Sequence, residues 1–355
     1  MKRTALLKKG GAALVAVLIM IILIAAGTAI MVVTGRGQIR EAGDVPYVPP
    51  IDSSSSAEDE SSEDDSSEPE PEPEPEYVFP APEPAEDYKE IDFKEDNLST
   101  KYGILVDLDK NEIVAGMNYD KPIFPASLTK VMSLVVAVEN IEDRAVEYKF
   151  TLDDISALMD ENASRAGFEP DESVSFTDLL YAAILPSGAD GTLGIAKLVA
   201  GSEEAFVELM NKKAEELHLE NTHFMNSSGL HDDDHYSTCK DMATILSYAM
   251  KNKLCRDVLT ADQFTTAKND IHPDGLTLYS LVQSRMIGYW VDCDGDGKGD
   301  ADVIGGKTGF TDEAGYCLET ILDKNDKNYI CITAKSTSDS RSIEDNIALY
   351  ENYLD

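Results

Sequence analysis

The sequence predicts an α+β domain in which one antiparallel sheet is built from both ends of the folded region and encloses a helical middle. Alternating apolar and polar residues form two hairpin patterns, near residues 103–117 and 313–335. The segments between them carry apolar residues at helical spacing. An uncharged run near the amino terminus and an acidic stretch after it predict that a transmembrane helix and a disordered linker precede this domain.

The charge of the chain is unevenly distributed. Its 355 residues include 30 Lys and Arg against 67 Asp and Glu, which gives a formal net charge of −37. Residues 1–40 carry a net charge of +6, residues 41–88 carry −17 and residues 89–355 carry −26. A surface this acidic repels phosphate backbones, so we exclude nucleic acid as a partner.

Residues 10–34 predict a single-pass membrane anchor. They carry no charge and are long enough, as a helix, to cross a bilayer core of about 30 Å. Four basic residues precede the run, so residues 1–9 are expected to form a cytoplasmic tail and the domain to lie outside the cell membrane. The competing interpretation is a signal peptide that is cleaved near Ala29. The apolar run is longer than a usual signal core, which favours the anchor.

Residues 35–97 predict an acidic, disordered linker rich in Ser, Glu and Pro. Residues 51–76 contain almost no apolar side chain, so they cannot bury enough surface to fold. In a polyproline II conformation, residues 41–88 would span on the order of 150 Å. We interpret the segment as a spacer that carries the domain away from the membrane; the alternative is a run that only adds solubility.

The folded domain is expected to span residues 98–355. Its first hairpin joins residues 103–108 to 112–117, and its last joins residues 313–322 to 328–335. Five helices are predicted between the hairpins, at residues 127–140, 176–185, 191–200, 203–217 and 240–252.

The first of these helices carries the first catalytic signal. It is apolar on nearly every face, which predicts a buried central helix. Ser127 lies in its first turn, where backbone N–H groups have no intrahelical partner and can bind an oxyanion. Lys130 follows on the same face, and a lysine in a dry site near another cation has a lowered pKa and can accept the serine proton. By itself the Ser-x-x-Lys pattern is a weak signal, because surface helices contain it by chance.

Two further motifs strengthen the signal. A Lys-Thr-Gly motif begins at Lys307 on an expected edge strand, and Ser187 follows a helix between the other two motifs. Ser-x-x-Lys, Ser-x-Asn and Lys-Thr-Gly occur together in class A β-lactamases and penicillin-binding proteins. In motif order, spacing and flanking phrases such as FPASLTKVM, DLLYAAILPSGAD and GGKTGFTDEAGYCL, residues 98–355 resemble the D-alanyl-D-alanine carboxypeptidases, the low-molecular-mass penicillin-binding proteins. The resemblance implies a β-lactamase/transpeptidase-like fold.

The resemblance also implies roles for individual residues. Ser127 corresponds to the acyl-forming nucleophile, Lys130 to its general base and Ser187 to the relay that returns the proton to the leaving D-alanine. The N–H groups of Ser127 and Phe310 are expected to form the oxyanion hole. The other residues assigned to substrate binding are Lys307, Thr308, Gly309, Asp190 and Arg341. For Arg341 the alternative is a surface salt bridge, which is the more common fate of such an arginine.

The middle motif departs from the family pattern. Ala189 stands where the family usually has Asn, and Asp190 follows it. Alanine cannot donate a hydrogen bond to the substrate carbonyl, so either Asp190 or a backbone group takes this role, or turnover is weakened. The alternatives of a full enzyme and an impaired or sensory protein stay open at this point.

An acidic segment after the helical region matches part of a calcium-binding loop. The side chains at loop positions 1, 3, 5 and 9 are Asp292, Asp294, Asp296 and Asp300. Position 12 is Val303, where a bidentate Glu is expected. A calcium ion and a solvated hairpin tip are the two interpretations, and the predicted reaction requires no cofactor.

Histidine and cysteine give weaker signals. The run from His231 to His235 has the composition of a metal site, but its match to a family loop favours a structural role. Five cysteines form an odd set for an exported domain. Cys317 and Cys331 lie on the two arms of the last hairpin at positions that permit pairing, whereas buried thiols are the simpler expectation.

The sequence therefore predicts a membrane-anchored, serine-type D-Ala-D-Ala carboxypeptidase that trims peptidoglycan stem peptides and is acylated by β-lactams. A DD-endopeptidase shares every motif. A β-lactamase needs a deacylating carboxylate, and no Glu-x-x-Leu-Asn phrase follows the middle motif. A weakly active penicillin-sensing or wall-binding protein is the third alternative.

Overall fold

The computed structural model describes residues 79–354. The predicted cytoplasmic tail, the predicted anchor at residues 10–34 and most of the predicted linker lie outside the described residues. Within the described range, no helix has both the length and the apolar character needed to cross a bilayer.

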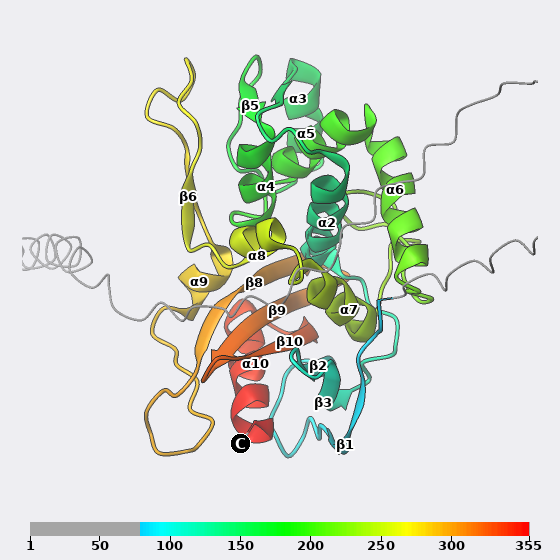
Figure 1. The fold of residues 1–355 in the computed structure, drawn as a ribbon, viewed down its shortest axis with the longest axis vertical. Helices are drawn as coiled ribbons and strands as arrows, with labels where there is room; N and C mark the ends of the chain where they lie inside the picture. Colours follow the sequence, from blue (N-terminus) through cyan, green and yellow to red (C-terminus); the bar gives the residue numbers. More distant parts are fainter. Residues whose placement is uncertain (1–78, 355) are drawn as a thin grey trace, which may run out of the picture. The chain divides into compact units, whose positions relative to one another are not determined.

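A six-stranded sheet forms the centre of the described region (Figure 1). Its strands are β1 (Glu83–Glu90), β2 (Tyr102–Asp107), β3 (Glu112–Met117), β8 (Asp302–Thr311), β9 (Gly315–Lys324) and β10 (Lys327–Ser336). They lie in the order β1-β3-β2-β10-β9-β8, and β2 pairs with β10. Both predicted hairpins, β2–β3 and β9–β10, are confirmed, as is a sheet built from the two ends of the domain.

Two predictions about the start of the domain were wrong. The strand β1 lies inside residues 35–97, which we assigned to the disordered linker, so the folded region begins before residue 98. The sheet is also not purely antiparallel, because β1 pairs with β3 in parallel. The side chains of β1 are mostly exposed, and the strand is held by backbone pairing at the sheet edge. A strand held in this way gives no apolar alternation for a sequence pattern to detect.

Some helices pack on this sheet, and the others form a helical part of the domain beyond it (Figure 1). A 3₁₀ turn, η1 (Ala126–Thr129), leads into α2, so the predicted helix at residues 127–140 begins with a tighter turn. The α-helices are α2 (Lys130–Asn140), α3 (Leu152–Asp160), α4 (Phe176–Ile184), α5 (Ala189–Ala200), α6 (Glu203–Glu216), α7 (Cys239–Ala249), α8 (Lys253–Leu259), α9 (Leu281–Met286) and α10 (Asp339–Tyr353). The five predicted helices are confirmed as α2, α4, α5, α6 and α7.

The central helix α2 is buried along its first two turns, as its apolar sequence predicted. It contacts α4, α5, α6, α7 and α8, which together form the helical part of the domain. The turn η1 that leads into it meets the edge strand β8. This arrangement brings the start of a buried helix to the edge of the sheet.

The carboxy-terminal helix α10 was not predicted. It packs against β9 and β10, where the Thr320 hydroxyl bonds to Asn346 and Tyr350. Polar residues on its buried side, such as Asp345 and Asn346, interrupt the apolar spacing that would reveal a helix. Asp345 is satisfied by the backbone N–H groups of Ser99 and Thr100.

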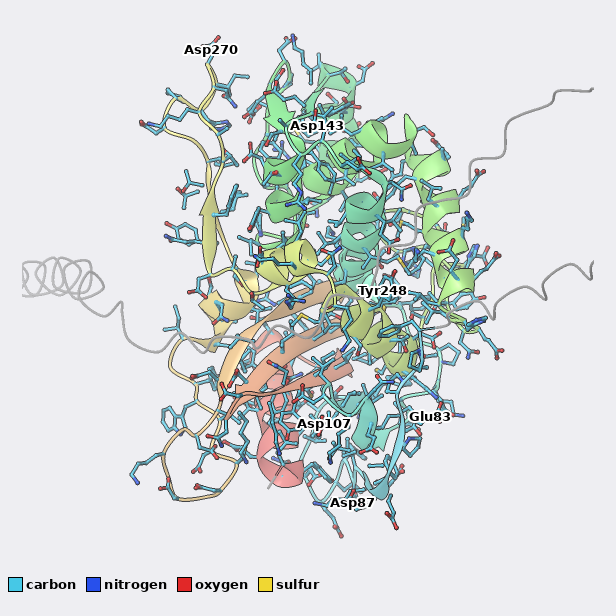
Figure 2. All side chains as sticks on the ribbon, in the orientation of Figure 1. Glu83, Asp87, Asp107, Asp143, Tyr248 and Asp270 are labelled. Atoms are coloured by element: carbon cyan, nitrogen blue, oxygen red, sulfur yellow. The ribbon has the colours of Figure 1, made fainter. Side chains whose placement is uncertain are left out.

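Two small sheets complete the described secondary structure. The strands β4 (Glu147–Lys149) and β5 (Ser173–Ser175) pair in one, and β6 (Gln263–Thr265) and β7 (Thr277–Tyr279) pair in the other. The acidic character of the chain is visible at the periphery, where Asp87, Asp143 and Asp270 are exposed (Figure 2).

All five cysteines are free and buried. The pairing of Cys317 with Cys331 is therefore wrong, and the expectation of buried thiols is confirmed. In the strand register, Cys317 lies opposite Gly309 and Cys331 lies opposite Thr320, so the two thiols are not cross-strand partners.

Candidate active site

The first element of the site is the turn that holds Ser127. The Nζ of Lys130 donates a hydrogen bond to the Ser127 Oγ at 2.8 Å. Lys130 is only 1% exposed, whereas Ser127 is partly exposed. The predicted nucleophile and base are thus in contact, and the nucleophile is accessible from outside.

The environment of Lys130 fits a base. Burial lowers the pKa of Lys130 to about 7, while the negative charges of Asp190 and Glu203 oppose the shift. Near neutral pH, Lys130 is therefore uncharged in a large fraction of the molecules and can accept the Ser127 proton.

Ser228 also contacts this pair. Its carbonyl oxygen accepts a hydrogen bond from the Lys130 Nζ at 2.5 Å and one from the Ser127 Oγ at 3.4 Å. A carbonyl oxygen at this place orients the amine without supplying a charge.

The loop that carries Ser228 is fixed to η1 and α2. The Ser133 hydroxyl donates to the carbonyl oxygen of Ser227 at 2.6 Å. Gly229 has a φ of +81°, and a Cβ there would come within 1.8 Å of the Ala126 carbonyl oxygen. Only glycine permits this close approach, which sets the loop against the nucleophile turn.

The second element is the edge strand β8. Lys307 is only 1% exposed, and its Nζ donates hydrogen bonds to the Ser187 Oγ and to the Thr308 carbonyl oxygen, each at 2.7 Å. Ser187 has a φ of +63°, a left-handed conformation that costs energy in a residue with a Cβ. The predicted relay and the lysine of the third motif are therefore also in contact.

The charge of Lys130 acts on Lys307. Burial holds the pKa of Lys307 well below its usual value, and the charge of Lys130 lowers it further. Both buried lysines of the site therefore lose their protons more readily than lysines in water do.

The two elements meet at Gly309. A Cβ on Gly309 would lie 3.1 Å from the Pro125 carbonyl oxygen and 3.2 Å from the Ser127 nitrogen, so a larger residue would push β8 away from the nucleophile. Phe310 follows, and its half-exposed ring packs on Tyr316 with 4.4 Å between centroids. The use of the Ser127 and Phe310 N–H groups as an oxyanion hole stays a prediction.

The structure contradicts our assignment of Asp190 to substrate binding. Asp190 is fully buried, and its Oδ1 accepts the N–H of Ala166 at 2.8 Å while its Oδ2 accepts those of Gly167 at 3.0 Å and Phe168 at 3.2 Å. A carboxylate occupied in this way fixes the loop at residues 163–168 and cannot reach a substrate carbonyl.

That loop in turn holds the middle motif. Ser164 Oγ donates to the Ser187 carbonyl oxygen at 2.6 Å, and the Ala189 N–H donates to the Ser164 carbonyl oxygen at 2.7 Å. Ala189 is buried. Asp190 therefore supports the backbone that positions Ser187 rather than replacing the missing Asn.

Arg341 forms salt bridges, which was the alternative to a role in substrate binding. It lies on α10, where its guanidinium contacts Glu344 at 3.0 Å and Asp345 at 3.1 Å and donates to the Asn97 carbonyl oxygen at 2.5 Å. These contacts include no residue of the catalytic cluster, so the carboxylate-binding role of Arg341 has no support in the structure.

Three residues close to the site were not predicted from the sequence. These are Ser228, Arg285 and Glu319. The charges of Arg285 on α9 and Glu319 on β9 both act on Lys307. Glu319 had a sequence signal that we did not use, since an acidic residue interrupts the buried half of the strand CLETIL.

Only three of the four predicted calcium ligands lie close together in the acidic loop. Carboxylate oxygens of Asp292, Asp294 and Asp296 lie within 4.8 Å of one another. Asp300 instead accepts the Cys293 N–H at 2.8 Å and lies 3.6 Å from Lys324. Calcium binding by the first three residues stays a prediction, and Asp300 does not belong to the cluster.

The loop from His231 to His235 has structural contacts. The Nε2 of His235 lies 2.8 Å from the Thr129 hydroxyl, and burial lowers the pKa of His235 to about 4. His231 lies 3.4 Å from Asp233 and 3.9 Å from Glu313. His235 thus packs behind the nucleophile turn as a neutral side chain.

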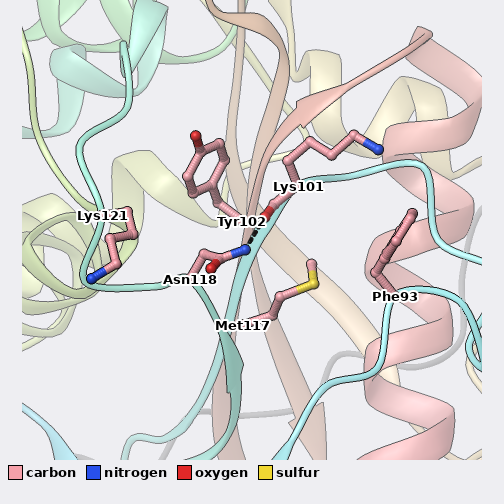
Figure 3. Close-up of a pocket in the computed structure, with 6 residues that line it drawn as sticks. All are labelled: Phe93, Lys101, Tyr102, Met117, Asn118 and Lys121. Atoms are coloured by element: carbon pink, nitrogen blue, oxygen red, sulfur yellow. Dashed lines mark hydrogen bonds between the residues drawn. The ribbon is translucent and has the colours of Figure 1, made fainter.

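A hollow of about 420 Å³ lies away from these residues (Figure 3). It is lined by Phe93, Lys101, Tyr102, Met117, Asn118 and Lys121. These residues belong to β2, β3 and their neighbouring loops, whereas Lys307 lies on the opposite edge strand of the sheet. The hollow is therefore not part of the catalytic cluster.

The sequence profile described as D-alanyl-D-alanine carboxypeptidase matches residues 89–337. The chain is 28% identical over 234 residues to D-alanyl-D-alanine carboxypeptidase DacF of Bacillus subtilis, which covers 65% of this chain and 56% of that protein. It is 32% identical over 225 residues to D-alanyl-D-alanine carboxypeptidase DacA of Escherichia coli, covering 61% and 51%.

Solved structures show the same fold. The crystal structure of a Streptomyces DD-transpeptidase is 25% identical, has a TM-score of 0.61 and covers 72% of this chain and 98% of that chain. A D-alanyl-D-alanine carboxypeptidase from Mycobacterium tuberculosis is 21% identical with a TM-score of 0.63, covering 77% and 96%, and supports the fold alone.

The matched region spans about half the length of the first curated relatives. The family profile nevertheless covers most of this chain, and its limits include all three motifs. The chain belongs to the D-alanyl-D-alanine carboxypeptidase family.

Proposed function

We propose that this protein is a serine-type D-Ala-D-Ala carboxypeptidase that removes the terminal D-alanine from peptidoglycan stem peptides. The observation that carries the proposal is the contact of two pairs at one site: Ser127 with Lys130, and Ser187 with Lys307. The names of the relatives support the reaction and its substrate class.

In the proposed reaction each group of the site has a role in acyl transfer. The Ser127 Oγ attacks the carbonyl carbon of the penultimate D-alanine, and Lys130 takes the hydroxyl proton. The proton passes to the leaving amine through Ser187, the C–N bond breaks and D-alanine departs. Water then attacks the acyl-enzyme ester and regenerates Ser127. Lys307 and Thr308 bind the terminal carboxylate of the substrate.

The proposal is tested by mass spectrometry of products from a muropeptide that ends in D-Ala-D-Ala. We expect the loss of one D-alanine, because the scissile bond is the last one of the peptide. Cleavage of cross-linked dimers without this loss would identify an endopeptidase instead. Rapid hydrolysis of penicillin would favour a β-lactamase, and penicillin acylation without any peptide product would favour a sensor.

We also propose that residues 10–34 anchor the enzyme in the cell membrane, with residues 1–9 in the cytoplasm and the domain outside. The uncharged run and the basic residues before it support this topology. We expect the full-length protein to stay in the membrane fraction at full mass when cells are fractionated. Release at a mass that lacks the first ~29 residues would show a cleaved signal peptide.

A further inference from the structure

Glu319 is a buried acid that the mechanism above does not use. It is fully buried in the middle of β9. Neither carboxylate oxygen has a hydrogen-bond partner among the described residues. Most buried polar groups in proteins are satisfied, so an acid left in this state requires an explanation.

The strand register places Glu319 beside the catalytic cluster. Glu319 is the direct cross-strand partner of Lys307, and directly opposed residues of an antiparallel pair project from the same face of the sheet. On its other side, Glu319 lies opposite Ile332 of β10. Its strand neighbours on the same face are Cys317 and Ile321, both buried. Lys307 is therefore the cation against which this acid is placed.

Lys307 needs an opposite charge. Its Nζ donates to the Ser187 hydroxyl and the Thr308 carbonyl oxygen, which are both uncharged acceptors. The other charged groups that act on Lys307 are Lys130 of α2 and Arg285 of α9, and both are positive. Burial and these two cations favour loss of the Lys307 proton, whereas the carboxylate of Glu319 favours its retention.

The charges of Glu319 and Lys307 affect each other's pKa. Burial raises the pKa of Glu319 well above its usual value, and the Lys307 charge opposes this shift. The Cys317 thiol, two residues along β9, also lies within the field of Glu319, and burial raises the pKa of that thiol to about 11, so it stays uncharged at neutral pH. Within the part of the chain that the structure describes, the only group of opposite sign that acts on either member of the pair is the other member.

We propose that Glu319 is a positioning residue for the proposed carboxypeptidase reaction: it is the internal counter-charge that keeps Lys307 protonated, so that Lys307 can bind the substrate's terminal carboxylate. Glu319 acts through Lys307 and does not touch the substrate. The inference deepens the proposed function, on which it rests for the identity of the ligand.

The main test is the pH dependence of acylation by a fluorescent penicillin, which itself carries a carboxylate. In the Glu319→Gln variant we expect the alkaline loss of acylation to move to lower pH by about one to three units, because Lys307 loses its proton more easily without the acid. Glu319→Asp retains the charge and should restore most of the wild-type profile. A Glu319→Gln profile that superimposes on the wild-type profile would overturn the proposal.

Asp323→Asn is the matched control. Asp323 lies four residues further along β9, on the same face, and its Oδ2 also lacks a hydrogen-bond partner among the described residues. It does not act on Lys307. The variant should keep the wild-type pH profile; an equal shift in both variants would show a general effect of charge and contradict a specific role for Glu319.

Thermal stability separates a charge-setting role from a structural one. Removing the counter-charge should lower the melting temperature of Glu319→Gln at pH values where Lys307 stays protonated, and by less at higher pH, where Lys307 loses its proton and acylation falls. Glu319→Met tests the same point with an apolar side chain. Joint loss of stability and acylation in both variants, with no change in the pH profile, would show that Glu319 is only structural.

A binding experiment keeps this test independent of turnover. In a Ser127→Ala background, calorimetry compares a peptide that ends in D-Ala-D-Ala with the same peptide amidated at its carboxy terminus. We expect Glu319→Gln to weaken binding of the free acid at pH 8–9 by about tenfold and to leave the amide unchanged. If the wild type binds the free-acid peptide but releases no D-alanine, the proposed function alone is refuted. If Glu319→Gln weakens binding of the free-acid peptide and the amidated peptide equally, the role of Glu319 is refuted.

Discussion

Replacing Lys130 by alanine is expected to slow acylation by penicillin by about 10²- to 10⁴-fold, the usual contribution of a general base. Without the amine 2.8 Å from its Oγ, Ser127 keeps its proton and is a weak nucleophile. The wild-type rate should rise with pH through about 7, where Lys130 becomes neutral, and this limb should be absent from the variant. The measurement is the second-order rate of labelling by a fluorescent penicillin across a pH series.

Two further variants calibrate that experiment. Ser127→Ala removes the atom that forms the ester and should give no covalent label, which sets the zero of the assay. Lys121→Ala removes a lysine whose side chain is 61% exposed and should label like the wild type. Labelling of Ser127→Ala, or a normal acylation rate in Lys130→Ala, would remove the respective residue from the mechanism.

Replacing Asp190 by alanine is expected to lower the free energy of unfolding by about 2–4 kcal/mol. The change leaves the N–H groups of Ala166, Gly167 and Phe168 without their acceptor in a partly buried loop. Asp190→Asn keeps one oxygen and should cost about half as much. Denaturant unfolding gives the free energies, and the penicillin labelling rate should fall in parallel because this loop holds the backbone of Ser187.

The matched control for Asp190 is Asp154, a second carboxylate that accepts a backbone N–H. It forms the capping box of α3 with Thr151 and is only partly buried. Asp154→Ala should cost about 1 kcal/mol, the usual effect of a lost cap, and leave the labelling rate unchanged. Equal costs for the two aspartates would show that the contacts of Asp190 are no more important than an ordinary cap.

Much of the catalytic cluster could be predicted from the sequence. Ser127 and Lys130 are three residues apart at the start of a buried helix, and helical spacing alone brings them together. The pairing of Ser187 with Lys307 spans 120 residues, and only the resemblance to the family indicated it. No local pattern could place these two side chains 2.7 Å apart.

The substrate-binding roles assigned to Asp190 and Arg341 were wrong for the same physical reason. Asp190 and Arg341 are charged residues near motifs, and sequence alone does not show which partner a charged side chain takes. Their partners include backbone groups of the loop at residues 163–168 and of Asn97, which are distant in sequence. The helix α10 and the strand β1 were missed for a related reason, since buried polar groups and edge pairing weaken the apolar periodicity.

The sequence by itself determined the two predicted hairpins, five of the helices and the Ser127–Lys130 pair, because apolar alternation and helical spacing are patterns within short segments of the chain. The tertiary structure decided which distant groups meet: the loop of Ser228 against Lys130, the acid Glu319 opposite Lys307, and Asp190 beneath the Ser187 segment. The reason is that burial, strand register and the electrostatic field of a site depend on contacts between segments that lie far apart in the chain. The charge state of Lys307, on which carboxylate binding rests, is a property of that assembled environment.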